Sequence, residues 1–299
     1  MKNILTELNN SNSENIDLQN TKEILTIINN EDQKVAIAIK QSLPSIEKAV
    51  DKITDSFLKG GRLAYFGAGT SGRLGVLDAS ECWPTYSFPP SKLKGYIAGG
   101  DYALRNSIEG AEDSIEEALK DIKDFSPTLN DVVVGISASG NPQYILKVLE
   151  TAKQHNATTI GITSNKDAKL KQFSDILILT EVGPEVISGS SRMKSGTAQK
   201  MVLNMLSTAS MIKIGKTYQN YMIDLRPTCD KLIKRANNII SKICKIPVEI
   251  ADNYRIKGDN NVKIACVMYK KQCTKQEAEE LLAQHNGILR KVIKEDEEK

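Results

Sequence analysis

The sequence predicts an α/β protein: a parallel β-sheet covered by helices on both faces, in three αβα layers, with helices before it and a small helical domain after it. Short, near-continuous runs of β-branched residues alternate with helix-length segments, as in sheets built from right-handed crossover units. After Arg226-Pro227 these runs stop and helical periodicity continues. A length of 299 residues suits one large and one smaller domain.

The N-terminal region predicts a loose arm followed by helices. Residues 1–20 are rich in Asn and lack apolar periodicity, so we expect an arm that is flexible unless a partner subunit orders it. Amphipathic segments then begin near Ile24, Val35 and Ile46, and the last ends at Gly60-Gly61. Pro44 is expected to mark a helix start.

The central region predicts the strands of the sheet. The expected strands are 63–66, 95–98, 132–136, 159–162 and 176–179. A long helix is expected over about 195–215.

The C-terminal region predicts a helical bundle. Helical patterns occupy 239–243, 262–268, 277–282 and 288–293, and the charged tail 294–299 is expected to fray. The predicted divisions are therefore an arm over 1–20, an α/β domain over 21–226 and a helical domain over 227–299.

Composition excludes several classes of function. The chain has only two histidines, His155 and His285, so a site that needs several imidazoles is excluded. Five cysteines without a CxxC pair favour a reducing compartment, and the absence of a leader-like segment or an 18-residue apolar run predicts a cytoplasmic protein that does not bind membranes. A net charge of +3 is too small to indicate a nucleic-acid partner.

A glycine-rich loop follows the first expected strand. The segment Phe66-Gly67-Ala68-Gly69-Thr70-Ser71-Gly72-Arg73 opens a helix, where backbone N–H groups and the hydroxyls of Thr70 and Ser71 can bind an anion. It matches GxGxxG literally, but no acidic residue closes the next strand as a dinucleotide site requires. The hydroxyls suit a phosphomonoester better, and an ordinary strand-to-helix turn without a ligand is the alternative.

A second loop of this kind follows Ile136. Ser137-Ala138-Ser139-Gly140-Asn141-Pro142 also opens a helix, and loops after neighbouring parallel strands meet in one crevice at the carboxyl edge of the sheet. A third polar cluster, residues 188–197, contains Arg192 and Lys194. Taken alone, that cluster is best interpreted as a capped helix start with solvated charges.

These blocks resemble a known family. The stretches FGAGTSGRLGVLDASECWPTY, IAGGDYALRNSIEGAEDS, VVVGISASG and GPEVISGSSRMKSGTAQKMVLNMLSTASMIKIGK are similar to the N-acetylmuramic acid 6-phosphate etherases, which belong to the sugar isomerase (SIS) domain group. The resemblance extends from about residue 20 to the end of the chain, and includes EAEELLAQHNGILRKVI. It implies an SIS-type fold, a homodimer, and no metal or organic cofactor.

The implied reaction is that of a lyase of cell-wall amino sugar recycling. It splits the D-lactyl ether of N-acetylmuramic acid 6-phosphate with water, and gives N-acetylglucosamine 6-phosphate and D-lactate. In the implied mechanism the sugar opens to its aldehyde, loses the C2 proton, expels lactate from C3 and then adds water. This chemistry needs a base and an acid, which two carboxyl groups can supply.

The resemblance also implies the site residues. It places the proton donor to lactate at Glu81 and the C2 base at Glu112, and the phosphate ligands at Thr70, Ser71, Ser137 and Ser139. The residues alone do not select these glutamates, since four acidic neighbours of Glu112 are rivals: Glu109, Asp113, Glu116 and Glu117.

Two positions depart from the family pattern. Trp83 replaces the usual first proline after Cys82; its ring either raises the pKa of the donor carboxyl by desolvation or packs the helix, and packing is favoured. Pro142 stands where related loops carry a phosphate-binding Thr, which puts that contact in doubt. Cys82 itself is expected to be buried and inert, because no histidine partner is available.

The sequence also allows two other functions. A catalytically silent sugar-phosphate sensor is suggested by the glucokinase regulatory protein, which resembles the same family, although that regulator carries two SIS domains. A phosphosugar aldose-ketose isomerase would share the fold without requiring the DASEC and EGAEDS blocks.

Overall fold

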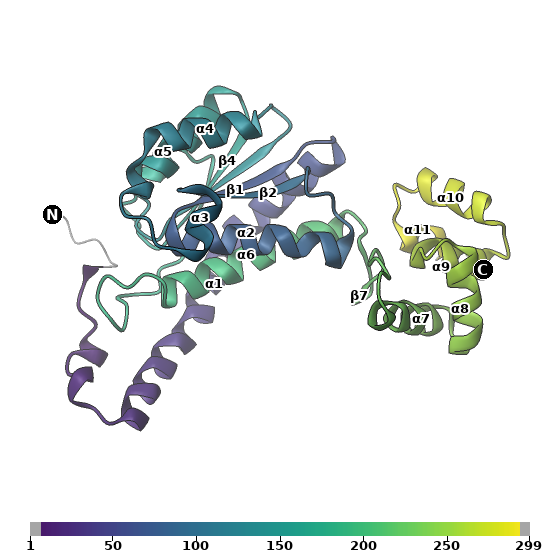
Figure 1. The fold of residues 1–299 in the computed structure, drawn as a ribbon, viewed down its shortest axis with the longest axis horizontal. Coiled ribbons are helices and arrows are strands. Elements are labelled where there is room, and N and C mark those ends of the chain that lie inside the picture. The colour runs from purple at the N-terminus through teal and green to yellow at the C-terminus, as the bar shows by residue number, and fades with distance from the viewer. Residues whose placement is uncertain (1–6, 294–299) are drawn as a thin grey trace. The chain divides into compact units, whose positions relative to one another are not determined.

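The fold is described by a computed structural model for residues 7–293 (Figure 1). The first six residues of the predicted arm and the predicted frayed tail, 294–299, lie outside the described residues. The chain divides into two compact units. The first unit contains Pro90–Ala209 and the chain up to Ser80, and the second contains Glu81–Pro89 and the chain from Ser210 onward. The predicted domain limits at residues 20 and 226 stay a prediction.

The first unit is built on a parallel five-stranded sheet in the order β2-β1-β3-β4-β5. All five strand predictions are confirmed, because buried β-branched runs of this kind suit a sheet that is covered on both faces. The strands are β1 (Leu63–Gly67), β2 (Leu93–Ile97), β3 (Val132–Ile136), β4 (Thr158–Thr163) and β5 (Ile176–Leu179).

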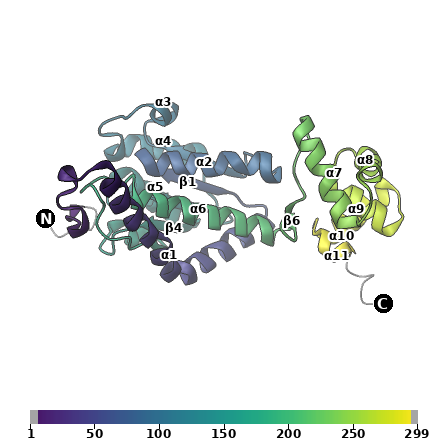
Figure 2. The same ribbon diagram turned by 90° about the horizontal axis from the view of Figure 1, so that it is seen from below.

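Helices cover both faces of this sheet, which confirms the predicted αβα layers (Figures 1 and 2). One face carries α4 (Ile115–Phe125) and α5 (Gln143–Gln154), and the other carries α1 (Thr21–Leu58), α2 (Gly69–Tyr86) and α6 (Lys194–Lys213). The short helix α3 (Gly100–Arg105) and the 3₁₀ helices η4 (Ala111–Asp113) and η5 (Lys169–Phe173) lie in the connections. An aromatic cluster of Phe66, Tyr96 and Phe125 packs beneath α4.

The N-terminal segments form one helix, α1, rather than a helix that restarts at Pro44. Asn20 and Glu23 form a capping box at its start, and a row of buried residues that includes Val35, Ile39 and Ile46 continues past the proline. The prediction of a helix start at Pro44 is therefore wrong. Pro44 is exposed, so the Lys40 carbonyl that lacks its usual N–H partner can be hydrated, which lowers the cost of an interior proline.

Residues 10–18 of the predicted arm are hydrogen-bonded to the first unit and contain two short 3₁₀ helices, Ser11–Ser13 and Ile16–Leu18. The Asn10 amide donates to a Glu31 carboxylate oxygen at 2.9 Å and to the Pro184 carbonyl at 3.0 Å. The Ser13 hydroxyl donates to the Val186 carbonyl at 2.7 Å. Side-chain hydrogen bonds order this segment, and they leave no trace in apolar periodicity.

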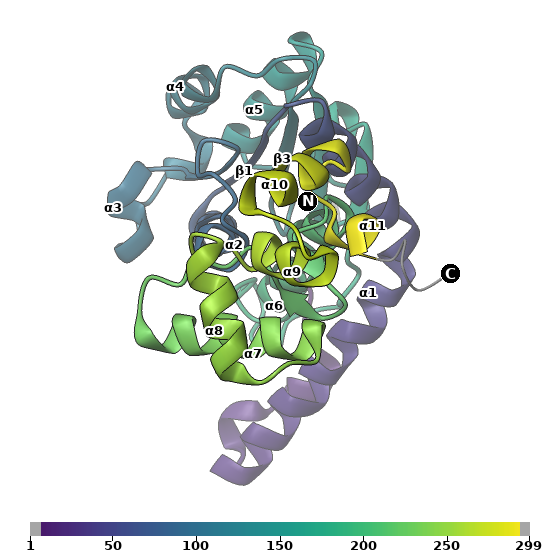
Figure 3. The ribbon, with the colours of Figure 1, turned by 90° about the vertical axis from the view of Figure 1, so that its right-hand side faces the viewer.

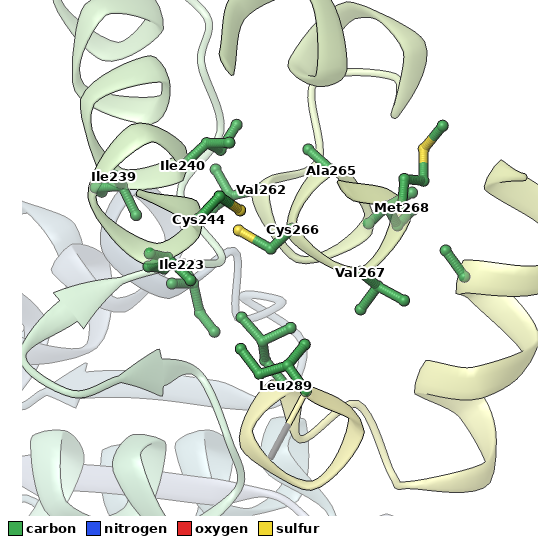
Figure 4. Close-up of a cluster of buried hydrophobic side chains, with 14 of the residues drawn as sticks. Ile223, Ile239, Ile240, Cys244, Val262, Ala265, Cys266, Val267, Met268 and Leu289 are labelled. Atoms are coloured by element: carbon green, nitrogen blue, oxygen red, sulfur yellow. The ribbon is translucent and has the colours of Figure 1, made fainter. Parts of the chain in front are cut away.

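The second unit packs short helices around α9 (Figure 3). A small hairpin of β6 (Thr217–Tyr218) and β7 (Tyr221–Met222) precedes them. The helices are α7 (Asp230–Cys244), α8 (Val248–Lys257), α9 (Val262–Lys271), α10 (Lys275–Gln284) and α11 (Leu289–Ile293). In its core the side chains of Cys244 and Cys266 point toward each other among aliphatic residues (Figure 4). The helical region is confirmed, whereas the hairpin and α8 were not predicted.

Candidate functional site

A pocket opens at the carboxyl edge of the sheet in the first unit. The cavity has a volume of about 520 Å³, within the range of small-molecule sites. It lies beside the ends of β1 and β3, the neighbouring strands from which the chain runs in opposite directions across the sheet. Ligands of open α/β sheets bind at this switch point, because the loops after these two strands diverge.

The first loop places Thr70 and Ser71 on the pocket wall at the start of α2. Its glycines permit a tight turn: a Cβ on Gly67 would lie 2.4 Å from the Gly72 nitrogen, and Gly69 has a φ of +53°. The eighteen residues of α2 direct its N-terminal N–H groups toward this edge, which favours an anion there.

The second loop places Ser137 and Ser139 on the same pocket. The Ser137 Oγ accepts the Gly140 N–H at 3.0 Å, and the Ser139 Oγ accepts the Asn141 N–H at 3.4 Å. Each hydroxyl therefore keeps its own proton for a ligand. Pro142 also lines the pocket and caps α5, but it has no hydroxyl for a phosphate.

Glu112 lines this pocket from η4, which follows Gly110 at a φ of +75°. Of its four rivals, only Glu109 lines the pocket as well. Glu117 instead accepts the Gly99 N–H at 2.5 Å, and Glu116 accepts the Ser114 hydroxyl at 3.4 Å.

Glu81 is not among the residues that line the pocket. It is an exposed residue of α2, and it lies in the segment Glu81–Pro89 that belongs to the second unit. Next to it Cys82 is buried, as predicted, and the Trp83 ring packs under the Arg226 guanidinium, 4.1 Å from the ring centroid. The five other predicted site residues are brought together, and the role of Glu81 stays a prediction.

Arg73 also lines the pocket, although it was not among the predicted site residues. Its guanidinium donates to the carbonyls of Ala103, Leu104 and Asn106 at 2.7 to 3.0 Å, and so fixes the end of α3 against α2. The signal was available, because this cation directly follows the glycine-rich loop. Its charge favours an anion in the pocket.

The third polar cluster contributes Gly189 and Ser191 to the pocket, but not the charge of Lys194. The Lys194 ammonium is 1% exposed and lies 2.6 Å from Glu31, which is 3% exposed, so the expectation that this charge is solvated is wrong. Burial opposes ionisation of Glu31, but hydrogen bonds from Lys194, Lys34, Asn12 and Asn10 outweigh it and lower its pKa to about 2.

Glu185 fixes the start of α6 behind this cluster. Its carboxylate is fully buried and accepts the backbone N–H groups of Lys194 and Ser195, both at 2.9 Å. The helix start is therefore capped, as expected, but by a carboxylate nine residues upstream and not by a neighbouring serine. This capping holds α6 close to α2, where a Cβ on Gly196 would lie 3.3 Å from the Thr70 methyl group.

Residues 7–293 contain no group of three or more His, Cys, Asp and Glu side chains suited to a metal ion. Over the same range, no helix is both long and apolar enough to cross a bilayer.

Two family models match parts of this chain. Residues 45–166 match the glucokinase regulatory protein N-terminal SIS domain, and residues 124–209 match the SIS domain. A phosphoheptose isomerase structure from Francisella tularensis is similar with a TM-score of 0.45 at 18% identity, covering 62% of this chain and 97% of that one.

Full-length relatives are closer. An N-acetylmuramic acid 6-phosphate etherase from Glaesserella parasuis is 51% identical over 288 residues, which cover 96% of this chain and 94% of the relative. N-acetylmuramic acid 6-phosphate etherase 2 from Lactiplantibacillus plantarum is 47% identical over 293 residues, with 98% and 99% covered. At this identity and coverage, the chain belongs to the N-acetylmuramic acid 6-phosphate etherase family.

Proposed function

We propose that this enzyme cleaves the D-lactyl ether of N-acetylmuramic acid 6-phosphate with water, giving N-acetylglucosamine 6-phosphate and D-lactate. One observation carries the proposal: two hydroxyl-bearing loops and Glu112 line the same pocket in a member of the etherase family. The enzyme acts in the cytoplasm, in amino sugar recycling, and as a homodimer.

The phosphate occupies the end of the pocket where the strands stop. Thr70, Ser71, Ser137 and Ser139 donate hydrogen bonds to its oxygens, and the N-terminus of α2 adds a favourable potential. Hydrogen bonds to a charged acceptor are stronger than neutral ones, so they hold the open-chain sugar in one orientation. This places C2 at Glu112, and such positioning contributes several powers of ten in rate.

The carboxyl groups then move the protons. Glu112 removes the proton from C2, which is acidic because the C1 aldehyde stabilises the resulting carbanion. The C3–O bond breaks, its electron pair leaves with the lactyl oxygen, and Glu81 protonates that oxygen. Water adds across the C2–C3 double bond, with hydroxyl on C3 and a proton returned to C2.

The test is incubation with N-acetylmuramic acid 6-phosphate while D-lactate release is measured. In deuterated water, the product should carry deuterium at C2. Lactate release without deuterium would support direct displacement and would overturn the elimination step. Binding without lactate release would support a sugar-phosphate sensor, which the match to the glucokinase regulatory protein domain makes the second candidate.

A further inference from the structure

The Ser71 hydroxyl is already engaged inside the protein. Its Oγ donates to the Gln199 Oε1 at 2.9 Å, although Ser71 lines the pocket. Both side chains are buried, at 8% and 1% exposed, and Gln199 comes from α6, 128 residues further along the chain. Because a hydroxyl has one proton, Ser71 in this arrangement presents only lone pairs to the pocket.

The hydroxyl groups of Ser137 and Ser139 accept hydrogen bonds from the protein, whereas that of Ser71 donates one. Their oxygens accept backbone N–H groups, so their protons are free to bind an anion. Ser71 would repel a phosphate oxygen in the orientation that it has with Gln199, whereas these two serines would attract one. The difference lies in the partner of each hydroxyl.

In the described part of the chain, only one of the two polar atoms of the Gln199 amide, Oε1, has a hydrogen-bond partner. Its Nε2 is buried, and no partner for it is found among the residues that the structure describes. The Ser195 Oγ, one turn earlier on the same face of α6, is also buried without a partner within residues 7–293. Unpaired buried polar atoms cost free energy, so this face of α6 is not optimised for packing alone.

Rotating the terminal amide by half a turn exchanges Oε1 and Nε2. Nε2 then donates to the Ser71 Oγ, and the Ser71 proton becomes free for the pocket. We propose that Gln199 is the positioning residue that sets the direction of the Ser71 hydroxyl: it accepts a hydrogen bond from Ser71 in the free enzyme, and it donates one to Ser71 when a sugar phosphate binds. This inference rests on the proposed function, since it assigns the phosphate to the pocket.

Gln199→Glu tests this directly, because an ionised carboxylate can only accept. We expect the KM for N-acetylmuramic acid 6-phosphate to rise about 10- to 100-fold at neutral pH, with kcat changed less than about threefold. Protonation gives the new carboxyl a donor, so the KM ratio of variant to wild type should fall as pH is lowered from about 8 to about 5. A ratio that is constant with pH would overturn the proposal.

Two matched variants separate positioning from packing and charge. Gln199→Met keeps the side-chain length and leaves the Ser71 proton free, but it cannot donate to Ser71, so its KM should rise several-fold less than that of Gln199→Glu. In a Ser71→Ala background, Gln199→Glu should lose most of its effect. A Gln199→Met variant as impaired as Gln199→Glu, or full additivity with Ser71→Ala, would show a structural role and refute the inference.

A measurement on the wild-type enzyme does not depend on the folding of Gln199→Glu. In protein labelled with ¹⁵N at glutamine side chains, the Gln199 amide signal is identified by its absence in Gln199→Met. Addition of N-acetylglucosamine 6-phosphate should shift one of its two protons downfield, and Ser71→Ala should abolish that shift. An unchanged signal at saturation would refute the proposal. If wild type releases no lactate, the proposed reaction fails, and this binding test still decides the role of Gln199.

Discussion

Several charged side chains are buried almost completely in the first unit, whereas in the second unit, whose core is largely aliphatic, they are buried less deeply. Glu31, Lys194 and Glu185 are buried in the first unit with their partners. In the second unit, Lys263 pairs with Asp224 at 2.8 Å, with their side chains 10% and 12% exposed, beside an aliphatic core cluster. The comparison shows that the first unit buries its ion pair and its capping carboxylate more completely than the second unit buries its charged groups.

The largest expected effect tests whether chemistry is confined to the first unit. Glu112→Gln in the first unit and Glu81→Gln in the second should each lower kcat for lactate release by about 10²- to 10⁴-fold, because each loses a proton-transfer group. KM should change by less than about threefold. Glu116→Gln is the control, since Glu116 does not line the pocket. Near-native turnover of Glu81→Gln would confine the chemistry to the first unit.

Breaking the buried ion pair should cost the most stability. Glu31→Gln leaves the Lys194 charge buried without its carboxylate, which lowers the free energy of unfolding by about 3–5 kcal/mol in chemical denaturation. Lys34→Ala is the matched control, because Lys34 pairs with the same carboxylate but is half exposed; it should cost less than about 1 kcal/mol. Equal losses for the two variants would contradict a special role for the buried pair.

The same pair predicts a pH dependence. The folded-state pKa of Glu31 is about 2 and its ordinary value is 4.5, so its contribution is fully present above pH 4.5 and is lost as pH falls toward 2. The stability difference between wild type and Glu31→Gln should therefore shrink over this range in denaturation curves. A difference that persists at pH 2 would show that the carboxylate charge is not its source.

The second unit should respond to lost volume instead. Ile240 is fully buried in its core, so Ile240→Ala should lower the free energy of unfolding by about 2–4 kcal/mol through lost burial and a residual cavity. Ile256→Ala on α8 is the control, because this side chain is 57% exposed and its truncation should cost less than about 1 kcal/mol. Calorimetry in which Ile240→Ala and Glu31→Gln lower different transitions would show that the two units unfold separately.

The smallest effect belongs to a single pocket hydroxyl. Ser137→Ala should raise KM about tenfold, because it removes one hydrogen bond to a charged phosphate oxygen. Ser188→Ala is the control, since Ser188 bonds the Glu7 carbonyl at 3.1 Å and does not line the pocket. A KM that Ser137→Ala leaves unchanged would place the phosphate elsewhere.

Local patterns predicted the strands and both pocket loops, because a buried β-branched run or a hydroxyl-rich turn consists of consecutive residues. Contacts between distant residues were not predicted. Gln199 meets Ser71 across 128 residues and Lys194 meets Glu31 across 163, and no periodicity encodes either pair. Helix α8 was missed for a local reason: its apolar residues are spread around the helix and do not form one apolar face.

The buried carboxylate of Glu185 limits where an anion can bind at the carboxyl edge of the sheet. Three helices, α2, α5 and α6, begin near the carboxyl edge of the sheet, and each helix start attracts negative charge. At α6 the protein supplies its own anion, since Glu185 occupies the N–H groups of Lys194 and Ser195. In the proposed reaction, this carboxylate would repel the phosphate of the substrate from α6 and leave it to the loops before α2 and α5.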